Sequence, residues 1–434
     1  MDNVSAKKIA HIIVGGTVGN ITEWYNFLLY GYLAAVISQL FFPAKNALLS
    51  LTLTFSVFAL SFFARPIGGV LFGWIGDTYG RQRALIFSLI LMGIPTVLIG
   101  CFPSYESVGV ISPILLCVLR ICQGFAAGGE HTGSAIYVAE HAPAARKTLW
   151  VSTVPASAAV GVLISSATAW LIIHSFSSDQ LLSWGWRVGF WAGGLLCFIS
   201  LLLRISMPES PLFEKVQKEN VAQHHSLLNL MKNREVCKSL LIVFCLASTW
   251  GIFYQILFIW MPTYLTRIAH LDNSTALKIN SLYILILAIL IIAVGYFADY
   301  LKRKLLLTIA CVGMMIVAYP LFSMLSSGIT WKIYSAMALF TLIFSLYLPV
   351  AFVSMIEAFP VNIRFTSLSF SFNIGLALFG GTTPLIATWL IEITGNKLAP
   401  AYYLIAAAML GLGAVACLLE TKKNNQEAAI SVIA

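Results

Sequence analysis

Charged residues are scarce in this sequence. Only 10% of the 434 residues are Asp, Glu, Lys or Arg, and 59% are hydrophobic, whereas about a quarter of an ordinary soluble domain is charged. A soluble fold could not bury so much apolar surface. The net charge of +9 would indicate nucleic-acid binding only if basic residues shared one soluble face, but they lie mostly in short segments between apolar runs. We therefore expect a chain embedded in lipid that binds no nucleic acid.

Paired cysteines, catalytic clusters and nucleotide-binding loops are missing as well. The eight cysteines lack the spacing of a metal site or a disulfide framework. The sequence has no Gly-x-x-x-x-Gly-Lys-Ser/Thr loop, which disfavours ATP-driven transport by this chain alone. It also has no His/Asp cluster or Ser/His/Asp set that would support an enzyme. We expect no enzymatic activity, no cofactor and no metal site.

Long uncharged runs are present instead. Ala84 to Pro103, Ile279 to Ala298 and Ala401 to Leu419 each carry about 18 residues or more, which is enough to cross a ~30 Å hydrocarbon core at 1.5 Å per residue. The sequence predicts an all-α membrane protein with twelve transmembrane helices in two six-helix halves. The predicted spans are 11–41, 48–76, 84–103, 110–140, 148–176, 187–205, 236–267, 276–298, 305–324, 330–358, 366–394 and 400–420.

The longest polar interval divides these spans into six and six. It predicts an N-terminal half over 1–206, a cytoplasmic linker over 207–235, a C-terminal half over 236–420 and a short cytoplasmic tail over 421–434. Two repeated halves related by an axis along the membrane normal, with a solute site at mid-membrane between them, form a known transporter plan. Alternating access then comes from rocking one half against the other.

Two sequence signals recur at corresponding places in the halves. Gly-x-x-x-Asp precedes a basic cluster after the second and the eighth span, and Glu-x-x-Pro precedes an arginine after the fourth and the tenth. An aspartate at a helix end can pair with arginine or with the N-terminus of a neighbouring helix, so we interpret these residues as a gate. The alternative, a purely topological positive anchor, does not explain the repeated aspartate. The predicted gating residues are Gly73, Asp77, Gly80, Arg81, Glu140, Arg146, Asp299, Arg303, Glu357 and Arg364.

The basic residues predict the orientation of the chain. Most of them fall on the side of the membrane that holds both termini, including Arg81, Arg83, Arg146, Arg204, Lys302, Arg303 and Arg364. The opposite side has only Lys45, Arg187, Arg267, Lys278, Lys332 and Lys397. The positive-inside rule therefore places both termini in the cytoplasm.

An ordered set of motifs covers nearly the whole chain. It consists of Gly19-Asn20-x-x-Glu23-Trp24-Tyr25-Asn26-Phe27 with Tyr30-Gly31, Arg65-Pro66-Ile67-Gly68-Gly69, Arg120-x-x-Gln123-Gly124-Phe125 with Gly128-Gly129-Glu130, Pro208-Glu209-Ser210-Pro211, and Asn373-Ile374-Gly375 with Phe379-Gly380-Gly381-Thr382-Thr383-Pro384. In these residues the chain resembles the major facilitator superfamily, in particular its metabolite:proton symporter branch, which includes proline/betaine, α-ketoglutarate, citrate and shikimate carriers.

The chain departs from this branch at three places. Asn26 stands where the family usually has an acidic residue, and an amide cannot titrate. His131 follows Glu130, where similar carriers more often have an aromatic residue. The tail after Glu420 lacks the long coiled-coil extension of some osmosensing proline/betaine carriers. Because of Asn26, the sequence is compatible with a proton-coupled carrier and with an uncoupled one.

Ionisable residues inside spans are the first candidates for a site, because each costs roughly 2.5–3.5 kcal/mol to insert. Glu23 is a candidate protonation site or a counter-charge to an arginine. Arg65 could clamp a substrate carboxylate or pair with Glu23 or Glu130. Arg120 lies about 15 Å from Glu130 along one helix, so each must face other helices. Glu130 is the second candidate protonation site, and His131 is either a proton relay or a satisfied polar residue.

Aromatic residues add a second kind of candidate. Trp24, Tyr25 and Tyr30 in the first span correspond to Trp250, Phe253, Tyr254 and Trp260 in the seventh. Facing aromatics could hold a quaternary ammonium by cation–π attraction, or could simply pack. The predicted substrate and proton site comprises Glu23, Asn26, Arg65, Arg120, Glu130, Tyr25 and Trp24.

The resemblance implies a secondary transporter in the bacterial inner membrane that works as a monomer. Intramembrane arginines favour a carboxylate-bearing substrate, and nearby acids and aromatics favour a zwitterion such as proline or betaine, carried together with protons. The alternatives are a dicarboxylate or other organic acid, an uncoupled uniporter or exchanger, and a channel or receptor on the same fold.

Overall fold

The computed structural model describes residues 6–44, 47–218 and 232–431, with side chains over 11–44, 49–218 and 232–418. This described part is helical and contains no strand. Residues 219–231 of the predicted linker and 432–434 of the predicted tail lie outside the described residues. The last helix, α19 (Ala399–Ser431), continues into the predicted tail.

The chain divides into two compact units. The first comprises Met1–His141 and Ser157–Ala222, and the second comprises Ala142–Ala156 and Gln223–Ala434. The helix α7 (Lys147–Ser175) begins in the second unit and ends in the first. The first unit also contains α1 (Ala6–Tyr32), α2 (Ala34–Phe41), α3 (Ala47–Thr78), α4 (Arg81–Cys101), α5 (Tyr105–Val108), α6 (Ile111–His141), α8 (Ser178–Gln180), α9 (Trp186–Ile205) and α10 (Pro211–Lys218). The two predicted six-helix halves stay a prediction.

Eleven of the described helical segments are long and apolar enough to cross a membrane. The first predicted span, 11–41, is not among them. The structure divides this span into α1 and α2, which meet at Leu33. Two further predicted spans are each built from several pieces. One consists of α12 (Arg234–Tyr254), a π-helical segment (Gln255–Trp260) and α13 (Met261–Arg267). The other consists of α17 (Arg364–Gly375), a π-helical segment (Leu376–Gly380) and α18 (Thr383–Thr394).

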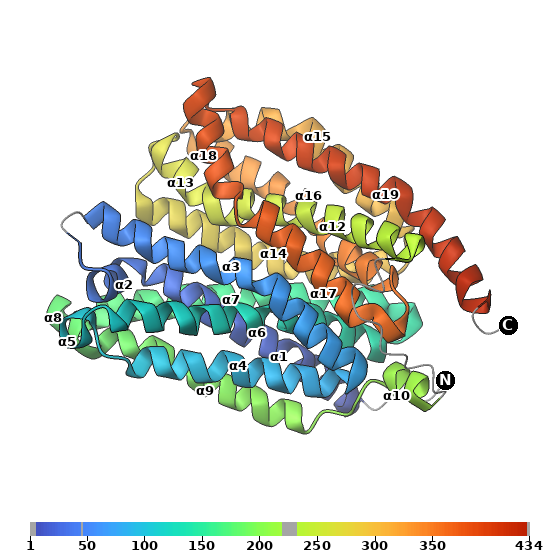
Figure 1. Cartoon of the computed structure of the whole chain (residues 1–434). Coiled ribbons are helices and arrows are strands. Elements are labelled where there is room, and N and C mark those ends of the chain that lie inside the picture. The colour runs from blue at the N-terminus through green and yellow to red at the C-terminus, as the bar shows by residue number, and fades with distance from the viewer. Residues whose placement is uncertain (1–5, 45–46, 219–231, 432–434) are drawn as a thin grey trace. The chain divides into compact units, whose positions relative to one another are not determined.

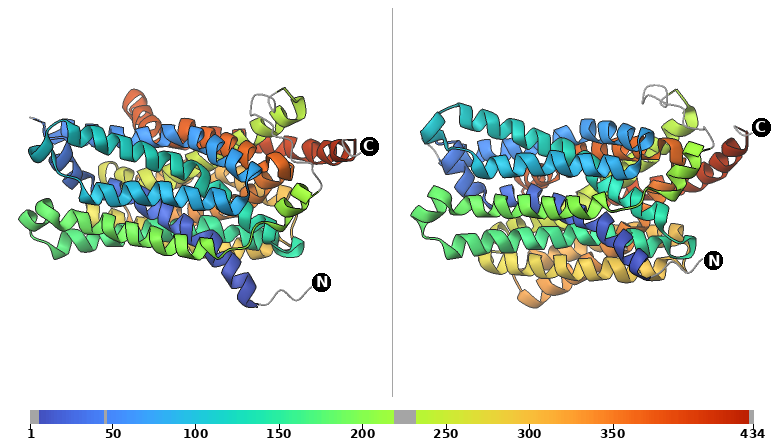
Figure 2. Two further views of the ribbon diagram at one scale, coloured as in Figure 1. Left: turned by 60° about the horizontal axis from the view of Figure 1, so that its bottom comes forward. Right: turned by 90° about the horizontal axis from the view of Figure 1, so that it is seen from below.

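Glycines bring α3 and α6 into close contact in the first unit. A Cβ atom at Gly68 would lie 2.0 Å from the Phe125 carbonyl oxygen, and one at Gly128 would lie 2.1 Å from the Arg65 carbonyl oxygen. Only glycine permits this approach, as in other membrane helix pairs. The long helices of the first unit, coloured blue to green, run side by side in both views of Figure 2. This packing places the intramembrane arginines of α3 and α6 next to α1.

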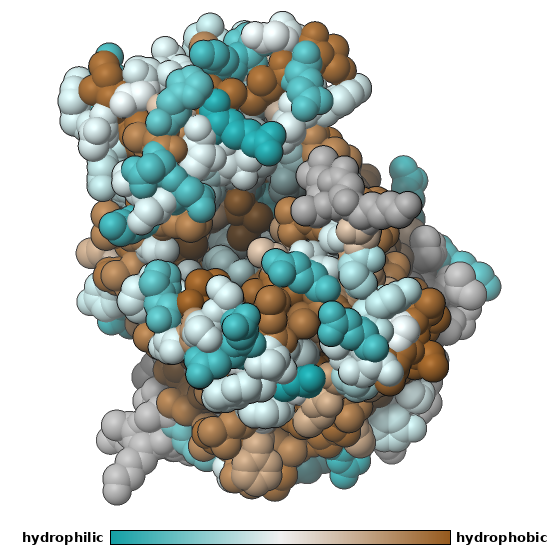
Figure 3. All heavy atoms as spheres, turned by 90° about the vertical axis from the view of Figure 1, so that its left-hand side faces the viewer, coloured by the Kyte–Doolittle hydropathy of each residue, from teal (hydrophilic) through white to brown (hydrophobic). Residues whose placement is uncertain are grey.

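The ends and the sides of the first unit differ. Figure 1 shows α2, α5 and α8 at one end of its helices and α10 at the other end. Figure 3, which looks onto the end that carries α5 and α8, shows hydrophilic residues gathered there among hydrophobic ones. Along the helices, in contrast, large apolar side chains such as Ile67, Ile94 and Leu195 are more than half exposed. Apolar sides with polar ends are what a membrane-spanning bundle requires.

The second unit is built around α12 and α16 (Thr330–Glu357), whose most apolar stretches are each 83% buried. The helices α14 (Asn273–Ala298) and α15 (Arg303–Leu325) pack on α16, while α17 and α19 pack on α12. Tyr347 links the two central helices, because its hydroxyl donates to the Leu246 carbonyl oxygen at 2.8 Å. The residues of this core are mostly aromatic and aliphatic.

Candidate functional site

A buried ion pair joins α1 and α3. Arg65 Nη2 donates to Glu23 Oε1 at 3.0 Å, and both side chains are only 1% exposed. Arg65 Nη2 also lies 3.3 Å from the Ala127 carbonyl oxygen of α6. Glu23 Oε2 has no hydrogen-bond partner among the described residues. The carboxylate is therefore held through one oxygen only, and of the two predicted partners of Arg65 the structure selects Glu23.

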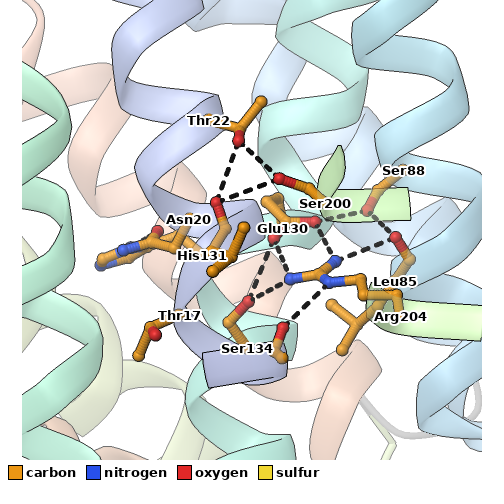
Figure 4. Close-up of polar contacts among 12 residues, drawn as sticks. Thr17, Asn20, Thr22, Leu85, Ser88, Glu130, His131, Ser134, Ser200 and Arg204 are labelled. Carbon is orange, nitrogen blue, oxygen red and sulfur yellow. Dashed lines mark hydrogen bonds and ion pairs between the residues drawn. The ribbon is translucent and has the colours of Figure 1, made fainter. Parts of the chain in front are cut away.

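A second buried pair joins α6 and α9, and it is fully satisfied (Figure 4). The guanidinium of Arg204 contacts both carboxylate oxygens of Glu130, with Nη1 2.6 Å from Oε2. Ser88 Oγ donates to Oε2 at 2.7 Å, and Ser134 Oγ donates to Oε1 at 3.1 Å. Arg204 Nη1 also donates to the Leu85 carbonyl oxygen at 2.9 Å. Both oxygens of Glu130 are thus occupied, unlike those of Glu23.

From the sequence, Arg204 was counted among the basic residues on the side that holds both termini, at the end of the sixth predicted span, and was given no partner. Arg204 lies in the last turn of α9 and is completely buried. An arginine at the end of an apolar run is indistinguishable in sequence from a positive-inside anchor, because its carboxylate partner lies on another helix. The serines at 88 and 134 had no sequence signal of their own.

Arg120 of α6 is a buried guanidinium with no carboxylate partner in the described part of the chain. Its Nη1 donates to Gln123 Oε1 at 2.8 Å, and Gln123 Nε2 in turn donates to Thr96 Oγ1 at 2.8 Å. Arg120 is completely buried, and its Nε and Nη2 atoms have no hydrogen-bond partner among the described residues. A buried charge that lacks a counter-charge is strongly unfavourable, so such an arginine calls for an explanation beyond packing.

Aromatic rings surround Arg120 on the sides not occupied by Gln123. The guanidinium carbon lies 4.5 Å from the Tyr30 ring centroid, 4.8 Å from that of Phe27 and 5.5 Å from that of Phe58. Phe27 is shared, because the guanidinium carbon of Arg65 lies 5.5 Å from the same ring centroid. Cation–π attraction supplies part of the missing stabilisation, since each contact contributes about 0.5–2 kcal/mol. Phe27 therefore connects the two arginines.

Tyr25 and Asn26 of α1, both predicted for the substrate and proton site, face α9 and not the two arginines. The Tyr25 hydroxyl donates to the Gly189 carbonyl oxygen at 2.9 Å. Asn26 Nδ2 lies 3.2 Å from Cys197 Sγ, and its Oδ1 has no partner among the described residues. A Cβ atom at Gly193 would lie 2.0 Å from that Oδ1 atom, so the amide lies tightly against α9. Asn26 is thus buried and neutral at the place where the resemblance leads one to expect an acid.

Trp24 and His131 form a separate polar contact. Their ring centroids lie 5.9 Å apart in an edge-on arrangement. His131 Nδ1 lies 2.7 Å from Asn20 Oδ1, and Asn20 Nδ2 donates to Ser157 Oγ at 2.8 Å. The histidine is therefore held through Nδ1, and both alternatives expected from the sequence, a proton relay and a satisfied polar residue, stay predictions. Trp24 packs beside it.

One end of the first unit holds a compact charge cluster at the end of α3. Arg81 Nη1 donates to Asp77 Oδ1 at 2.7 Å, and Arg81 Nε donates to Glu140 Oε2 at 3.2 Å. Arg81 is completely buried, whereas Gly73 lies buried within α3, one turn before Asp77. Gly80 has φ of 115°, a conformation that favours glycine. The structure thus brings together Asp77, Gly80, Arg81 and Glu140, four of the five predicted gating residues of the first unit, and the fifth, Gly73, lies one turn away in α3.

The segment before α10 closes over this cluster. Glu209 Oε1 accepts a hydrogen bond from the Arg81 backbone N–H at 2.9 Å, which caps the N-terminus of α4. Ser210 Oγ donates to Glu140 Oε2 at 2.5 Å, and the Phe213 ring centroid lies 5.3 Å from the Arg81 guanidinium carbon. Burial raises the pKa of Glu209 above its ordinary value. Glu209 and Ser210 belong to the Pro208-Glu209-Ser210-Pro211 motif, to which no role was assigned from the sequence.

The corresponding signals of the second unit form a different set of contacts. Asp299 Oδ1 and Oδ2 accept from the backbone N–H groups of Thr148 at 2.8 Å and Leu149 at 3.0 Å, and so cap α7. Glu357 pairs with Arg303 at 2.7 Å and with Lys147 at 3.2 Å. Asp77 and Asp299 thus use the two kinds of partner that the sequence suggested, an arginine and a helix N-terminus.

The last two predicted gating residues, Arg146 and Arg364, make contacts with aromatic rings and with the backbone. The guanidinium carbon of Arg146 lies 4.7 Å from the Tyr296 ring centroid and 4.9 Å from that of Tyr300. Arg364, at the start of α17, is buried and donates from Nε to the Phe359 carbonyl oxygen at 3.1 Å.

The seventh predicted span carries a cluster of aromatic rings in the second unit. Trp250 stacks on Tyr254 with ring centroids 5.8 Å apart, and lies 5.1 Å from the Phe372 centroid. Phe253 packs on Tyr347 at 5.7 Å. Each of these rings is buried, so within this unit they form a core.

Comparison with known proteins identifies the family. The Major Facilitator Superfamily profile matches residues 21–378. The chain is 31% identical to the glycine betaine/proline/ectoine/pipecolic acid transporter OusA of Dickeya dadantii (strain 3937), over 93% of this chain and 82% of that protein. It is 30% identical to the proline/betaine transporter of Escherichia coli (strain K12), again over 93% and 82%. A relative from Staphylococcus aureus (strain COL) is 35% identical over 94% of this chain and 88% of its own length.

Solved structures agree with this family at the level of the fold. The proton:xylose symporter XylE, bound to 6-bromo-6-deoxy-D-glucose, matches with a TM-score of 0.78 at 19% identity, covering 96% of each chain. A crystal structure of the Escherichia coli fucose:proton symporter FucP matches with a TM-score of 0.68 at 14% identity, covering 96% of this chain and 98% of its own. The chain therefore belongs to the Major Facilitator Superfamily and is an integral membrane transporter, not an enzyme.

Proposed function

We propose that this secondary transporter carries a small carboxylate-bearing metabolite, such as proline or betaine, together with protons across a bacterial inner membrane. The names of the relatives, which carry proline, betaine and related zwitterions, support this substrate class. The distribution of lysine and arginine supports an orientation with both termini in the cytoplasm. Transport by the monomer is the simplest arrangement for this fold.

The observation that carries proton coupling is the half-satisfied carboxylate of Glu23. Arg65 bonds one oxygen of this carboxylate, and the other oxygen has no partner among the described residues, so a proton can bind there without displacing a protein hydrogen bond. Protonation removes the counter-charge of Arg65, so the local charge and packing change together. At Glu130, in contrast, Arg204 and two serines occupy both carboxylate oxygens.

The direction of the pH effect follows from the groups around Glu23. Besides Arg65, the charged groups that act on Glu23 from neighbouring helices are Glu130 on α6 and Arg204 on α9, and His131 of α6 lies near Arg65. Glu130 and Arg204 neutralise each other, and His131 is bonded to Asn20. Glu23 is then the group whose charge responds to the proton gradient. Uptake should rise as the pH on the loading side falls.

The two charge clusters at the helix ends are proposed to act as gates. Asp77, Arg81 and Glu140 close one end of the first unit, and Asp299 with the Glu357 pairs closes one end of the second. Ion pairs and caps of this kind can break and re-form as a transporter changes state.

The test is uptake of labelled proline, glycine betaine, α-ketoglutarate, citrate and shikimate into proteoliposomes, with and without an inward proton gradient. We expect the gradient to drive accumulation of proline or betaine in wild type. Glu23→Gln should retain downhill exchange but lose gradient-driven accumulation. Glu106→Gln, which changes an exposed glutamate of α5 in the same way, serves as the matched control and should behave as wild type.

An uncoupled uniporter or exchanger is the second candidate, and Asn26 is the observation that favours it. This residue is a buried amide at a place where an acid would titrate. Downhill transport that is indifferent to the gradient in wild type would establish this alternative. Accumulation of α-ketoglutarate or citrate alone would replace the zwitterion by an organic acid as the substrate.

A further inference from the structure

We propose that Arg120 binds the substrate carboxylate. Its guanidinium is positioned by the side chains of Gln123, Phe27, Tyr30 and Phe58. This inference rests on the proposed function, because it assigns the binding residue of that same transport cycle. Its first support is chemical. A guanidinium offers a planar fork of donors that matches a carboxylate, and two donor atoms of this fork, Nε and Nη2, are unoccupied in the part of the chain that the structure describes.

A comparison of the buried arginines gives the second support. Arg65, Arg81, Arg120 and Arg204 are the completely buried arginines of the first unit. Arg65 pairs with Glu23, Arg81 with Asp77 and Glu140, and Arg204 with Glu130. Arg120 alone among these four has no carboxylate within the described residues. Since the protein supplies carboxylates for the others, the missing one is assigned to the ligand.

The orientation of the guanidinium gives the third support. Gln123 holds Nη1 at 2.8 Å and is itself held by Thr96. Three aromatic rings have their centroids within 5.5 Å of the guanidinium carbon. The Tyr30 hydroxyl is the one hydrogen-bonding group that these three side chains carry. That hydroxyl donates to the Thr54 carbonyl oxygen at 3.0 Å. The guanidinium is thus positioned from one side and left unneutralised by the described residues.

The charges around Phe27 indicate how many carboxylates the substrate carries. Phe27 contacts two guanidinium groups, those of Arg65 and Arg120, and the one carboxylate bonded to them among the described residues is that of Glu23. A single substrate carboxylate neutralises the site while Glu23 is ionised. When Glu23 is protonated, Arg65 is also uncompensated and attraction for an anion rises. Proton and substrate therefore favour each other's binding, and by linkage the coupling is reciprocal.

The test is counterflow exchange in proteoliposomes without a proton gradient, using labelled L-proline and labelled glycine betaine. The half-saturating concentration of each labelled acid is measured first. Its unlabelled methyl ester is then added as a competitor, and the half-inhibitory concentration of the ester is measured. The readout is the ratio of the apparent affinity for the acid to that for the ester. We expect wild type to prefer the acid strongly. Arg120→Lys should raise the half-saturating concentration at least about tenfold, because the bidentate fork is lost. Arg187→Lys is the control, because Arg187 donates, among the described residues, to the backbone carbonyl oxygens of Gly100 and Phe102 and to no carboxylate.

A second variant keeps the proposal falsifiable if Arg120 variants fail to fold. Gln123→Glu places a carboxylate of the same shape beside the guanidinium and should leave the fold intact. It should occupy Arg120 internally, reduce affinity for the acid at least about tenfold and bring the acid-to-ester ratio toward one. An unchanged ratio in Gln123→Glu would overturn the assignment of Arg120. Wild type that exchanges neither proline nor betaine would overturn the proposed zwitterion substrate and this inference with it.

Discussion

At the scale of single residues, the two buried ion pairs of the first unit differ in how fully they are satisfied. Glu130 is bonded at both oxygens, so its substitution should affect stability more than coupling. Glu130→Gln leaves Arg204 buried without a counter-charge and should lower the free energy of unfolding by about 3–5 kcal/mol. The measurement is the thermal unfolding midpoint in detergent, together with gradient-driven uptake at a temperature where the variant is folded.

The double variant Glu130→Gln with Arg204→Met is the control for this prediction. It removes the orphaned charge, so part of the lost stability should return. Loss of gradient-driven uptake in Glu130→Gln at an unchanged unfolding midpoint would contradict the structural role and make Glu130 the coupling residue instead.

At the scale of elements, the motif before α10 caps α4 through Glu209, and Gly80 makes room for that cap. A Cβ atom at Gly80 would lie 2.1 Å from Glu209 Oε2. Gly80→Ala should therefore displace the cap and cost roughly 0.5–2 kcal/mol beyond backbone strain. Gly109→Ala is the matched control, because Gly109 also has positive φ, at 61°, but has nothing within 4 Å of its Cβ position. Equal losses of thermal stability in the two variants would show that the cap contributes nothing.

At the scale of the whole molecule, the orientation in the membrane can be tested directly. The positive-inside rule predicts that a fluorescent protein fused after Ala434 folds in the cytoplasm and fluoresces. Alkaline phosphatase inserted after Lys45 or after Glu106 should be active, because both positions are expected on the opposite side. An active phosphatase at the C-terminus would reverse the topology and, with it, the assignment of the charge clusters to the cytoplasmic side.

The sequence alone determined the class of the protein, its membrane setting and its family. Uncharged runs long enough to cross a bilayer leave few alternatives to a helical bundle, because every backbone polar group must be satisfied within lipid. The ordered motifs from Gly19 to Pro384 indicated the family, and the family profile confirms it. The sequence also singled out Glu23, Arg65, Arg120 and Glu130, because ionisable residues inside spans are costly and therefore rare.

Only the tertiary structure decided which of these residues belong together. Sequence spacing shows which residues share a helix, but the partners of a buried charge lie on other helices. The sequence therefore indicated no role for Arg204 beyond its positive charge, whereas the structure pairs it with Glu130. The sequence also did not predict the break of the first span at Leu33 or the cap that Glu209 forms on α4. Within the described residues, helix packing alone left Glu23 half-satisfied and Arg120 without a carboxylate, and these two residues carry the functional proposals.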